Sequence, residues 1–286
     1  MHGLMIVNGF LRSDAFERMY AALFCAAQKA VITLEVVTND ALCPLDEAFF
    51  TREIDFVLFW DKDTRLACAL EKRGLKVFNS AKSIALCDDK TLTYLALAGV
   101  VPMPETILAP LSFSGFGKTE FLTRVGEQLS YPYVLKEGCG SFGQQVYMIR
   151  DEASAHALLE QIGERPVLFQ RLIAESAGRD ARLYVVGDRC VAAIRRINEK
   201  DDFRANIAGG GRAEKYAPTR EEEALALLAT RALGLTFAGV DILFSKDGPL
   251  LCEVNSNAHF TALSAVTGAR PAEDIMREIK RQCAAQ

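Results

Sequence analysis

The chain is organised around one segment, Pro132-Tyr133-Val134-Leu135-Lys136-Glu137-Gly138-Cys139-Gly140-Ser141-Phe142-Gly143. It predicts an apolar strand, followed by a loop over residues 138–143 with the pattern G-x-G-x-x-G. A dinucleotide-binding fingerprint needs a helix directly after its glycines, whereas residues 144–149 alternate as a strand does. A glycine loop between two strands is the geometry of a flap that closes over ATP phosphates through backbone N–H groups. The alternative interpretation is a hairpin turn that binds nothing.

Lys136 favours phosphate binding by this loop. It ends an apolar strand immediately before the glycines, where its ammonium group can reach the same phosphates as a point charge. A second candidate loop, residues 115–119, resembles the end of a P-loop, but that motif requires glycine at the position of Ser112. We therefore interpret the region around Lys118 as the start of a helix.

The segments on either side of the glycine loop indicate two classes of fold. Before residue 80, predicted strands alternate with helices, which indicates an α/β unit with a small, mostly parallel sheet. After residue 133, most predicted strands are joined by tight turns, which indicates antiparallel hairpins and an α+β unit. Between them, residues 88–98 predict a helix that Gly99 ends. Further helices are expected over 152–162, 220–233 and 271–283.

The composition excludes several functional classes. The 286 residues carry a net charge of −4 without a basic tail, so we expect neither a nucleic-acid partner nor binding to an anionic membrane. No apolar run approaches the roughly 18 residues that span a bilayer. The eight cysteines lie at least 18 residues apart, and the N-terminus lacks the pattern of a signal peptide. We therefore expect a reduced, cytoplasmic protein.

A second chemical cluster is predicted near the C-terminus. Glu253 and Asn255 are two residues apart on a strand, so they share one face, while Cys252 and Val254 take the other. Asp241 lies on the preceding strand, inside an otherwise apolar run. Two buried carboxylates side by side are costly unless a cation lies between them, and oxygen ligands of this kind suit Mg²⁺. The alternative is a pair of carboxylates held by Lys or Arg.

Charged residues between the two clusters extend the set. Asp180 and Arg182 share a strand face, where they offer an acceptor for a hydroxyl group and a clamp for an anion. Asp202-Phe203-Arg204-Ala205-Asn206 follows, and glycines 209–211 could bring backbone donors to a developing oxyanion. A solvated loop rich in Arg and Asp is the alternative.

The ordered set of these motifs resembles the ATP-grasp superfamily and, within it, the RimK-like α-L-glutamate ligases. The resemblance covers roughly residues 85–283, and the preceding part looks like the domain that usually comes before it. It implies an ATP-grasp fold after a small Rossmann-like βαβ domain, divided into residues 1–84, a lobe with the glycine flap over 85–172 and a lobe with the metal site over 173–286. The matching stretches are residues 132–136, 138–143, 178–182, 202–206, 238–241 and 253–255.

The resemblance also implies roles for individual residues. The implied nucleotide-binding set is Lys90, Lys136, Gly140, Ser141, Phe142, Gly143, Gln170, Arg171, Leu172, Ile173, Asp180, Arg204 and Asn206, with residues 170–173 along the adenine and Asp180 at the ribose. The implied catalytic set is Lys136, Arg182 and Arg204, of which Arg182 would steady a carboxylate while it is phosphorylated. The implied metal ligands are Asp241, Glu253 and Asn255, for Mg²⁺ with Mn²⁺ as an alternative.

This chain departs from the family pattern at two places. Arg171 stands where family members usually carry Glu, and Ser256-Asn257-Ala258-His259-Phe260 replaces the usual small-Pro-Gly turn. We expect the second departure to border the acceptor pocket. Asn8-Gly9 and Asp61-Lys62-Asp63 follow predicted strands, so they either frame the same pocket or are solvated turns.

The resemblance implies an ADP-forming carboxylate–amine ligase that makes an amide through an acyl phosphate, adding an amino acid such as glutamate to an acceptor. The expected partners are small-molecule carboxylate and amine substrates or a peptide or protein acceptor, and a homo-oligomer stays open. The chain has only three histidines, which fits catalysis by positioning and charge stabilisation. An ATP-binding scaffold without turnover is the alternative, while the strand after the glycine loop disfavours a dehydrogenase.

Overall fold

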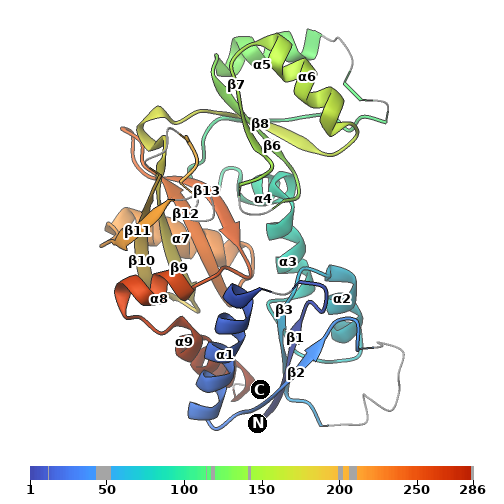
Figure 1. Cartoon of the computed structure of the whole chain (residues 1–286), viewed down its shortest axis with the longest axis vertical. Coiled ribbons are helices and arrows are strands. Elements are labelled where there is room, and N and C mark those ends of the chain that lie inside the picture. The colour runs from blue at the N-terminus through green and yellow to red at the C-terminus, as the bar shows by residue number, and fades with distance from the viewer. Residues whose placement is uncertain are drawn as a thin grey trace.

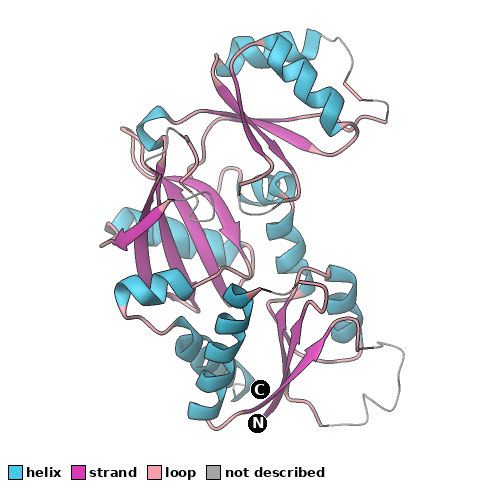
Figure 2. Ribbon diagram, in the orientation of Figure 1, coloured by secondary structure: helices cyan, strands magenta, loops and turns pink. Residues whose placement is uncertain are grey.

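The computed structural model of the protein describes residues 1–11, 13–42, 53–113, 115–116, 120–140, 143–198, 202–205 and 211–284. Three sheets organise this part of the chain, and helices cover their faces (Figures 1 and 2). The predicted pairing of an α/β unit with an α+β unit is confirmed. None of the helices in the described part is long and apolar enough to cross a membrane.

The N-terminal sheet is parallel. Its order is β2-β1-β3-β4, and every neighbouring pair runs in the same direction. Its elements are β1 (His2–Val7), α1 (Asp14–Lys29), β2 (Thr33–Thr38), β3 (Phe56–Trp60), α2 (Thr64–Lys72) and β4 (Val77–Phe78). The five residues of β3 are all buried, because a helical layer packs on each face of the sheet. This architecture places the ends of β1 and β3, with Asn8 and Asp61 beyond them, at one edge of the sheet.

Two helices connect the N-terminal sheet to the next unit. They are α3 (Ala81–Asp88) and α4 (Lys90–Leu97), so the single helix predicted over 88–98 is wrong at its start. Asp89 interrupts the helical path with extended backbone, and its carboxylate accepts a hydrogen bond from the backbone N–H of Thr91. Lys90 therefore lies in the first turn of α4 rather than inside a continuous helix.

The second sheet forms a small lobe with a core of its own. It is antiparallel with the order β5-β8-β6-β7, and α5 and α6 cover one face (Figure 1). Its elements are β5 (Thr106–Leu108), α5 (Glu120–Leu129), β6 (Tyr133–Glu137), β7 (Val146–Ile149), α6 (Glu152–Ile162) and β8 (Val167–Arg171). The glycine loop joins β6 to β7, as the alternation after the glycines predicts. Lys118 lies outside the described residues.

The third sheet is the largest, and its strands carry the predicted site residues Asp180, Arg182, Asp241, Glu253 and Asn255. It is antiparallel with the order β11-β10-β9-β12-β13. Its elements are η2 (Ala174–Ser176), β9 (Arg179–Val186), β10 (Arg189–Ile197), β11 (Arg212–Lys215), α7 (Arg220–Ala232), β12 (Phe237–Leu243), β13 (Leu250–Asn255), α8 (Thr261–Thr267) and α9 (Pro271–Ala284). One face packs against α7 and the other against α8 and α9.

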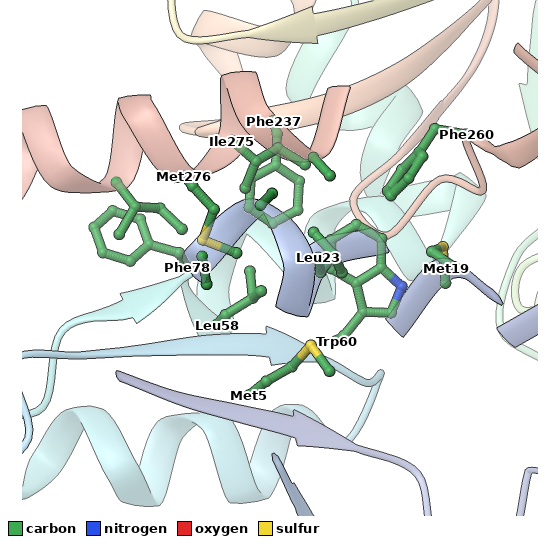
Figure 3. Packing of buried hydrophobic residues seen from close by; sticks show 14 of the residues in the cluster. Met5, Met19, Leu23, Leu58, Trp60, Phe78, Phe237, Phe260, Ile275 and Met276 are labelled. Atoms are coloured by element: carbon green, nitrogen blue, oxygen red, sulfur yellow. The ribbon is translucent and has the colours of Figure 1, made fainter. Parts of the chain in front are cut away.

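A continuous apolar core joins the N-terminal sheet to the large sheet. Trp60 at the end of β3 stacks on Phe237 of β12, with ring centroids 5.4 Å apart and an interplanar angle of 11° (Figure 3). Helices α1 and α9 lie side by side in the same layer (Figure 1). Buried Asn79 adds a polar joint, because its Nδ2 donates to the carbonyl oxygens of Phe237 and Ser256 at 2.9 Å each. The chain after β13 is thereby fixed against the N-terminal sheet.

Candidate functional site

Two adjoining cavities lie where the three sheets meet. The lobe cavity lies between the small lobe and the large sheet, and the interdomain cavity lies between the N-terminal sheet and the large sheet. The interdomain cavity has a volume of about 530 Å³. Arg196, Asp241 and Glu253 line both cavities, so the two spaces meet at these three charged side chains.

The glycine loop lies over two lysines. Lys136, the fourth residue of β6, is 8% exposed, and its Nζ lies 4.0 Å from the sulfur of Cys252. The backbone N–H of Lys90 donates to the carbonyl of Gly138 at 2.8 Å, and its Nζ lies 3.3 Å from the carbonyl oxygen of Gly140. The Lys90 contacts hold the N-terminus of α4 against the described part of the loop, and both lysines line the lobe cavity.

Glycine is required at position 140 for both conformation and space. Gly140 has a φ of +149°, and a Cβ atom there would lie 2.3 Å from Oε1 of Gln145. Arg204 closes the loop from the large lobe, because its Nη1 donates to the carbonyl of Gly143 at 2.7 Å while Asp202 holds the rest of its guanidinium. The predicted residues Ser141, Phe142 and Asn206 lie outside the described part of the chain.

The strand end at residues 170–173 forms one wall of the lobe cavity. Gln170 is 7% exposed and donates from Nε2 to the hydroxyl of Thr106 at 2.9 Å. The guanidinium of Arg171 turns to the surface, where it pairs with Glu105 and donates to the carbonyls of Leu129 and Gln128. Arg171 therefore offers the cavity its backbone and inner side-chain atoms, which agrees with its departure from the family Glu.

Four alternating charges form a buried network across β9, β10 and β12. Arg182 donates from Nε and Nη2 to the two carboxylate oxygens of Asp241, each at 2.7 Å. Arg196 donates from Nε to Asp180 at 2.6 Å and pairs through Nη2 with Asp241 at 2.8 Å. Bidentate pairing of this kind fixes both position and charge state.

Burial and pairing act in opposite directions on the two carboxylates. Burial raises the pKa of Asp180 even though Arg196 opposes the shift. Burial also acts on Asp241, but Arg182 and Arg196 together outweigh it and hold the pKa of that carboxyl below its usual range. Asp241 therefore stays ionised in the folded protein.

Arg196 is a member of this charge network that the motifs miss. It is 3% exposed and lies directly opposite Asp180 in the pairing of β9 with β10. The available signal is positional, because Ile194 and Arg196 share a strand face and Ile194 is buried. An arginine on a buried face requires a carboxylate partner, and the predicted Asp180 is the partner it finds.

The predicted metal ligands come together at the edge of β12 and β13. Asp241 lies directly opposite Glu253 and Gly239 directly opposite Asn255 in the strand pairing. Glu253 forms no ion pair with any described residue, and Nδ2 of Asn255 is buried without a hydrogen-bond partner. In the described part of the chain, no three His, Cys, Asp or Glu side chains come together as a possible metal site. The predicted ligand set is of another kind, because it combines two carboxylates with one amide. The assignment of Asp241, Glu253 and Asn255 stays a prediction.

A β-bulge changes the face that Cys252 occupies. The pairing of β12 with β13 shifts register between Asp241 and Ile242, so Cys252 is an extra residue between Leu251 and Glu253. Cys252 consequently lines the lobe cavity beside Glu253 and approaches Lys136. The prediction that Cys252 and Val254 share the opposite face is wrong for Cys252, because strict alternation fails at a bulge.

The interdomain cavity is lined by residues at the two predicted strand ends and by the segment that replaces the family turn. Asn8 and Asp61 lie at its N-terminal wall, and Asn257 and His259 come from the segment after β13. Nδ2 of Asn257 donates to the backbone carbonyl of Asp61 at 2.8 Å, which ties the two walls together. The ring of His259 packs edge-on against that of Phe16, with ring centroids 4.3 Å apart. Burial lowers the pKa of His259. The neutral imidazole is thereby favoured.

The structure brings most of the predicted residues to these two spaces. Lys90, Lys136, Gly143, Gln170, Arg171, Leu172, Ile173, Asp180, Arg204, Asp241 and Glu253 line the lobe cavity, and Gly140, Arg182, Asp241, Glu253 and Asn255 line the interdomain cavity. Arg182 and Asp180 are held in ion pairs rather than left open to a ligand, so their roles stay predictions. Asn8, Asp61 and Lys62 line the interdomain cavity, whereas Gly9 and Asp63 do not.

Comparisons with known proteins agree with this geometry. The model of the RimK-like ATP-grasp domain matches residues 87–279. A probable alpha-L-glutamate ligase from Histophilus somni strain 2336 is 33% identical over 245 residues, covering 82% of this chain and 80% of that protein. The residues matched by the family model include the glycine loop and strands β12 and β13.

Two solved structures share the fold over nearly the whole chain. A RimK domain ATP-grasp protein from Sphaerobacter thermophilus has a TM-score of 0.73 at 24% identity, covering 97% of this chain and 99% of that one. A D-alanine–D-alanine ligase from Bacillus anthracis, solved with ATP, has a TM-score of 0.76 at 17% identity, covering 100% and 98%. The predicted ATP-grasp fold is confirmed, and the chain belongs to the RimK-like ATP-grasp family of ligases.

Proposed function

We propose that this ligase joins a carboxylate to an amine through an acyl phosphate, with ATP as the phosphate donor. The observation that carries the proposal is the meeting of the two cavities at Arg196, Asp241 and Glu253. A nucleotide under the glycine loop and a substrate in the interdomain cavity would face each other at that point. From the names of the relatives, we propose L-glutamate as the amino acid that is joined.

The proposed reaction has two steps. A carboxylate oxygen attacks the γ-phosphorus while the bond to the β-phosphate oxygen breaks, which gives the acyl phosphate and ADP. The amine nitrogen then attacks the acyl carbon, and the carbon–oxygen bond to phosphate breaks as the nitrogen loses a proton. The products are an amide, ADP and inorganic phosphate.

The chain's own residues supply position and charge for these steps. Lys90, Lys136 and Arg204 line the lobe cavity, where three cations would oppose the charge of the phosphates. Arg182 lines the interdomain cavity with 18% of its side chain exposed, so it borders the space for the attacking carboxylate.

ATP-grasp ligases use ATP with a divalent metal ion, and the residues present fit one. Glu253 and Asn255 offer an unpaired carboxylate and an amide at the edge of the cavity, beside Asp241. We propose Mg²⁺, with Mn²⁺ as an alternative. Bound there, the ion would neutralise phosphate oxygens. Asp241 would contribute by sharing oxygens that Arg182 and Arg196 also bind, since each carboxylate oxygen has more than one acceptor site.

The remaining parts of the proposal concern organisation and setting. We propose units of residues 1–84, 85–172 and 173–286, a cytoplasmic location, and a small carboxylate with an amine or a peptide or protein acceptor as partners. A scaffold without turnover is the competing function, although the retained lysines and carboxylates argue against it. In place of the helix that hydride-transfer cofactors need, β7 follows the glycine loop.

ADP release is the test of this function. The protein is incubated with ATP, Mg²⁺ and L-glutamate, together with a panel of amino acids, dicarboxylates and short peptides, and products are identified by mass. Hydroxylamine added in place of the amine should trap the acyl phosphate as a hydroxamate. Glu253→Gln should abolish ADP release, whereas Glu175→Gln, an exposed carboxylate of the same lobe, should not. ATP binding without ADP under every substrate pair would support the scaffold instead.

A further inference from the structure

One end of the interdomain cavity holds a carboxylate that neutral groups keep in place. Asp61, directly after β3, is 8% exposed and accepts hydrogen bonds from the side-chain amides of Asn8 and Asn39 at 3.1 and 2.8 Å. The backbone N–H of Lys62 donates to the same carboxylate at 2.7 Å. Asn39 and Asn8 thereby hold Asp61 against the cavity wall without neutralising its charge.

The cations that line this cavity are already paired elsewhere. Lys62 pairs with Asp88, Arg182 pairs with Asp241, and Arg196 pairs with both Asp180 and Asp241. Among the residues that the structure describes, none forms an ion pair with Asp61. A poorly solvated carboxylate without a cationic partner is costly, and a bound ligand that supplies the cation removes this cost.

Polar atoms without partners surround the same space. The indole N–H of Trp60 is buried without an acceptor, and Trp60 is 3% exposed. The hydroxyl of Tyr20 and Oδ1 of Asn257 are likewise buried without hydrogen-bond partners. Burial, with a contribution from the Asp61 charge, raises the pKa of Tyr20 to about 12, so the phenol stays neutral beside that carboxylate. A ligand here can receive hydrogen bonds as well as donate them.

We propose that Asp61 binds the organic ammonium group of an amino-acid substrate, with Asn257 Oδ1 as a second acceptor. The indole N–H of Trp60 and the hydroxyl of Tyr20 then donate hydrogen bonds to oxygen atoms of the same substrate. This inference rests on the proposed function, because it assigns a substrate group to the same reaction site. An ammonium group has three donors, which matches a carboxylate and an amide oxygen at one end of the cavity. The ammonium belongs either to the amine substrate or to the amino acid whose carboxylate is phosphorylated.

Direct binding tests the inference without turnover. Calorimetry of the full chain with ATP analogue and Mg²⁺ compares L-glutamate with glutarate, L-aspartate with succinate and L-alanine with propionate. The wild type should bind at least one ammonium-bearing ligand about 10- to 100-fold more tightly than its deaminated analogue, as expected for a charge-assisted hydrogen bond. Asp61→Asn should remove this difference. Equal binding of every pair by the wild type would overturn the inference.

Asp63→Asn is the matched control, because it makes the same substitution two residues further along the chain. Asp63 caps the N-terminus of α2 by accepting from the backbone N–H groups of Arg65 and Leu66, and it does not line the cavity. Asparagine caps helices as well as aspartate does, so Asp63→Asn should keep the discrimination between each pair. Tyr20→Phe removes only an unpartnered hydroxyl, so it should fold normally and bind the amino acid several-fold more weakly. Unchanged binding in Tyr20→Phe and undiminished discrimination in Asp61→Asn would each contradict the assignment.

Hydroxylamine separates the two sources of the ammonium group. If the group belongs to the phosphorylated amino acid, Asp61→Asn raises KM for that substrate in the hydroxamate assay, which contains no amine substrate. If it belongs to the amine, hydroxamate formation is unchanged and KM for the amine rises in the complete reaction. A protein that binds amino acids through Asp61 but releases no ADP would refute the proposed function and leave this inference standing.

Discussion

Replacing Arg196 by methionine tests the buried charge network most directly. Arg196→Met keeps a side chain of similar length but removes the cation that, among the described residues, forms an ion pair with Asp180. Asp241 keeps its bidentate partner Arg182, so the loss falls mainly on Asp180, which is 5% exposed. Methionine fills the space of the arginine stem, which limits any cavity effect.

The expected loss of stability depends on pH. Leaving one charge of a buried pair without its partner costs about 3–5 kcal/mol. Asp180 can avoid part of this by taking up a proton, at a cost of about 1.36 kcal/mol for each pH unit above its unfolded-state pKa of about 3.9. Protonation therefore limits the loss to about 1.5 kcal/mol at pH 5, whereas near pH 8 it should reach the full about 3–5 kcal/mol. The folded-state pKa of Asp180 lies above the unfolded one, so stability falls as pH rises.

Urea unfolding at pH 5 and pH 8, followed by circular dichroism, measures both values. Arg195→Met is the matched control, because Arg195 is the adjacent residue on β10 and pairs with Glu214 at the surface, with 42% of its side chain exposed. A surface pair of this kind contributes about 0–1 kcal/mol and should show little dependence on pH. Equal losses in the two variants, or an Arg196→Met loss that does not grow with pH, would refute the argument for a buried network.

Three further outcomes are expected. Lys136→Met should lower kcat/KM for ATP at least about 100-fold in the ADP-release assay with little change in Tm, because it removes a cation aimed at phosphate; unchanged kinetics would exclude phosphate contact. Asn79→Ala should destabilise the protein by about 3–5 kcal/mol in urea unfolding, since it leaves backbone groups of residues 236, 237 and 256 without partners. A loss below about 1 kcal/mol would show that these hydrogen bonds do not hold the two sheets together. Burial raises the pKa of Cys252 to about 11, so its thiol should react with iodoacetamide at pH 8 far more slowly than that of exposed Cys25. Peptide mass mapping measures both rates, and equal rates would show that the cavity is open.

The sequence predicted the parts of the fold that follow from short-range patterns. The strand after the glycine loop, the parallel order before residue 80 and the helix over 152–162 all follow from periodicity and turn residues. Helix α3 was not predicted, and the helix predicted over 88–98 begins at Lys90 instead, because Asp89 looks like any polar helical residue in the sequence. The bulge at Cys252 was also hidden, because an extra residue leaves no mark on a strand that already mixes polar and apolar side chains.

The residues of the candidate site also divide into those that short motifs predicted and those that they missed. Lys136, Glu253 and Asn255 could be found because each belongs to a short motif with a chemical reason for its spacing. Arg196 could not, because its importance depends on which strand lies beside β9, and strand pairing is a long-range property. Tyr20 and Trp60 were likewise missed, because nothing in α1 or β3 indicates that both border a cavity with the segment after β13.

The arrangement of the cores suggests why the two cavities can serve different purposes. The small lobe has its own apolar core, drawn entirely from residues 107–169, so the glycine loop is carried by a unit that packs independently. The interdomain cavity lies instead on a core shared between the N-terminal sheet and the large sheet (Figure 3). Asn79 and Asn257 add hydrogen bonds across the same boundary. A lobe that packs independently can adjust to a nucleotide, while a shared core holds Asp61 at a fixed position relative to Arg182. If Asp61 binds the substrate as proposed, recognition depends on the contact between the N-terminal sheet and the large sheet as well as on the motifs that define the family.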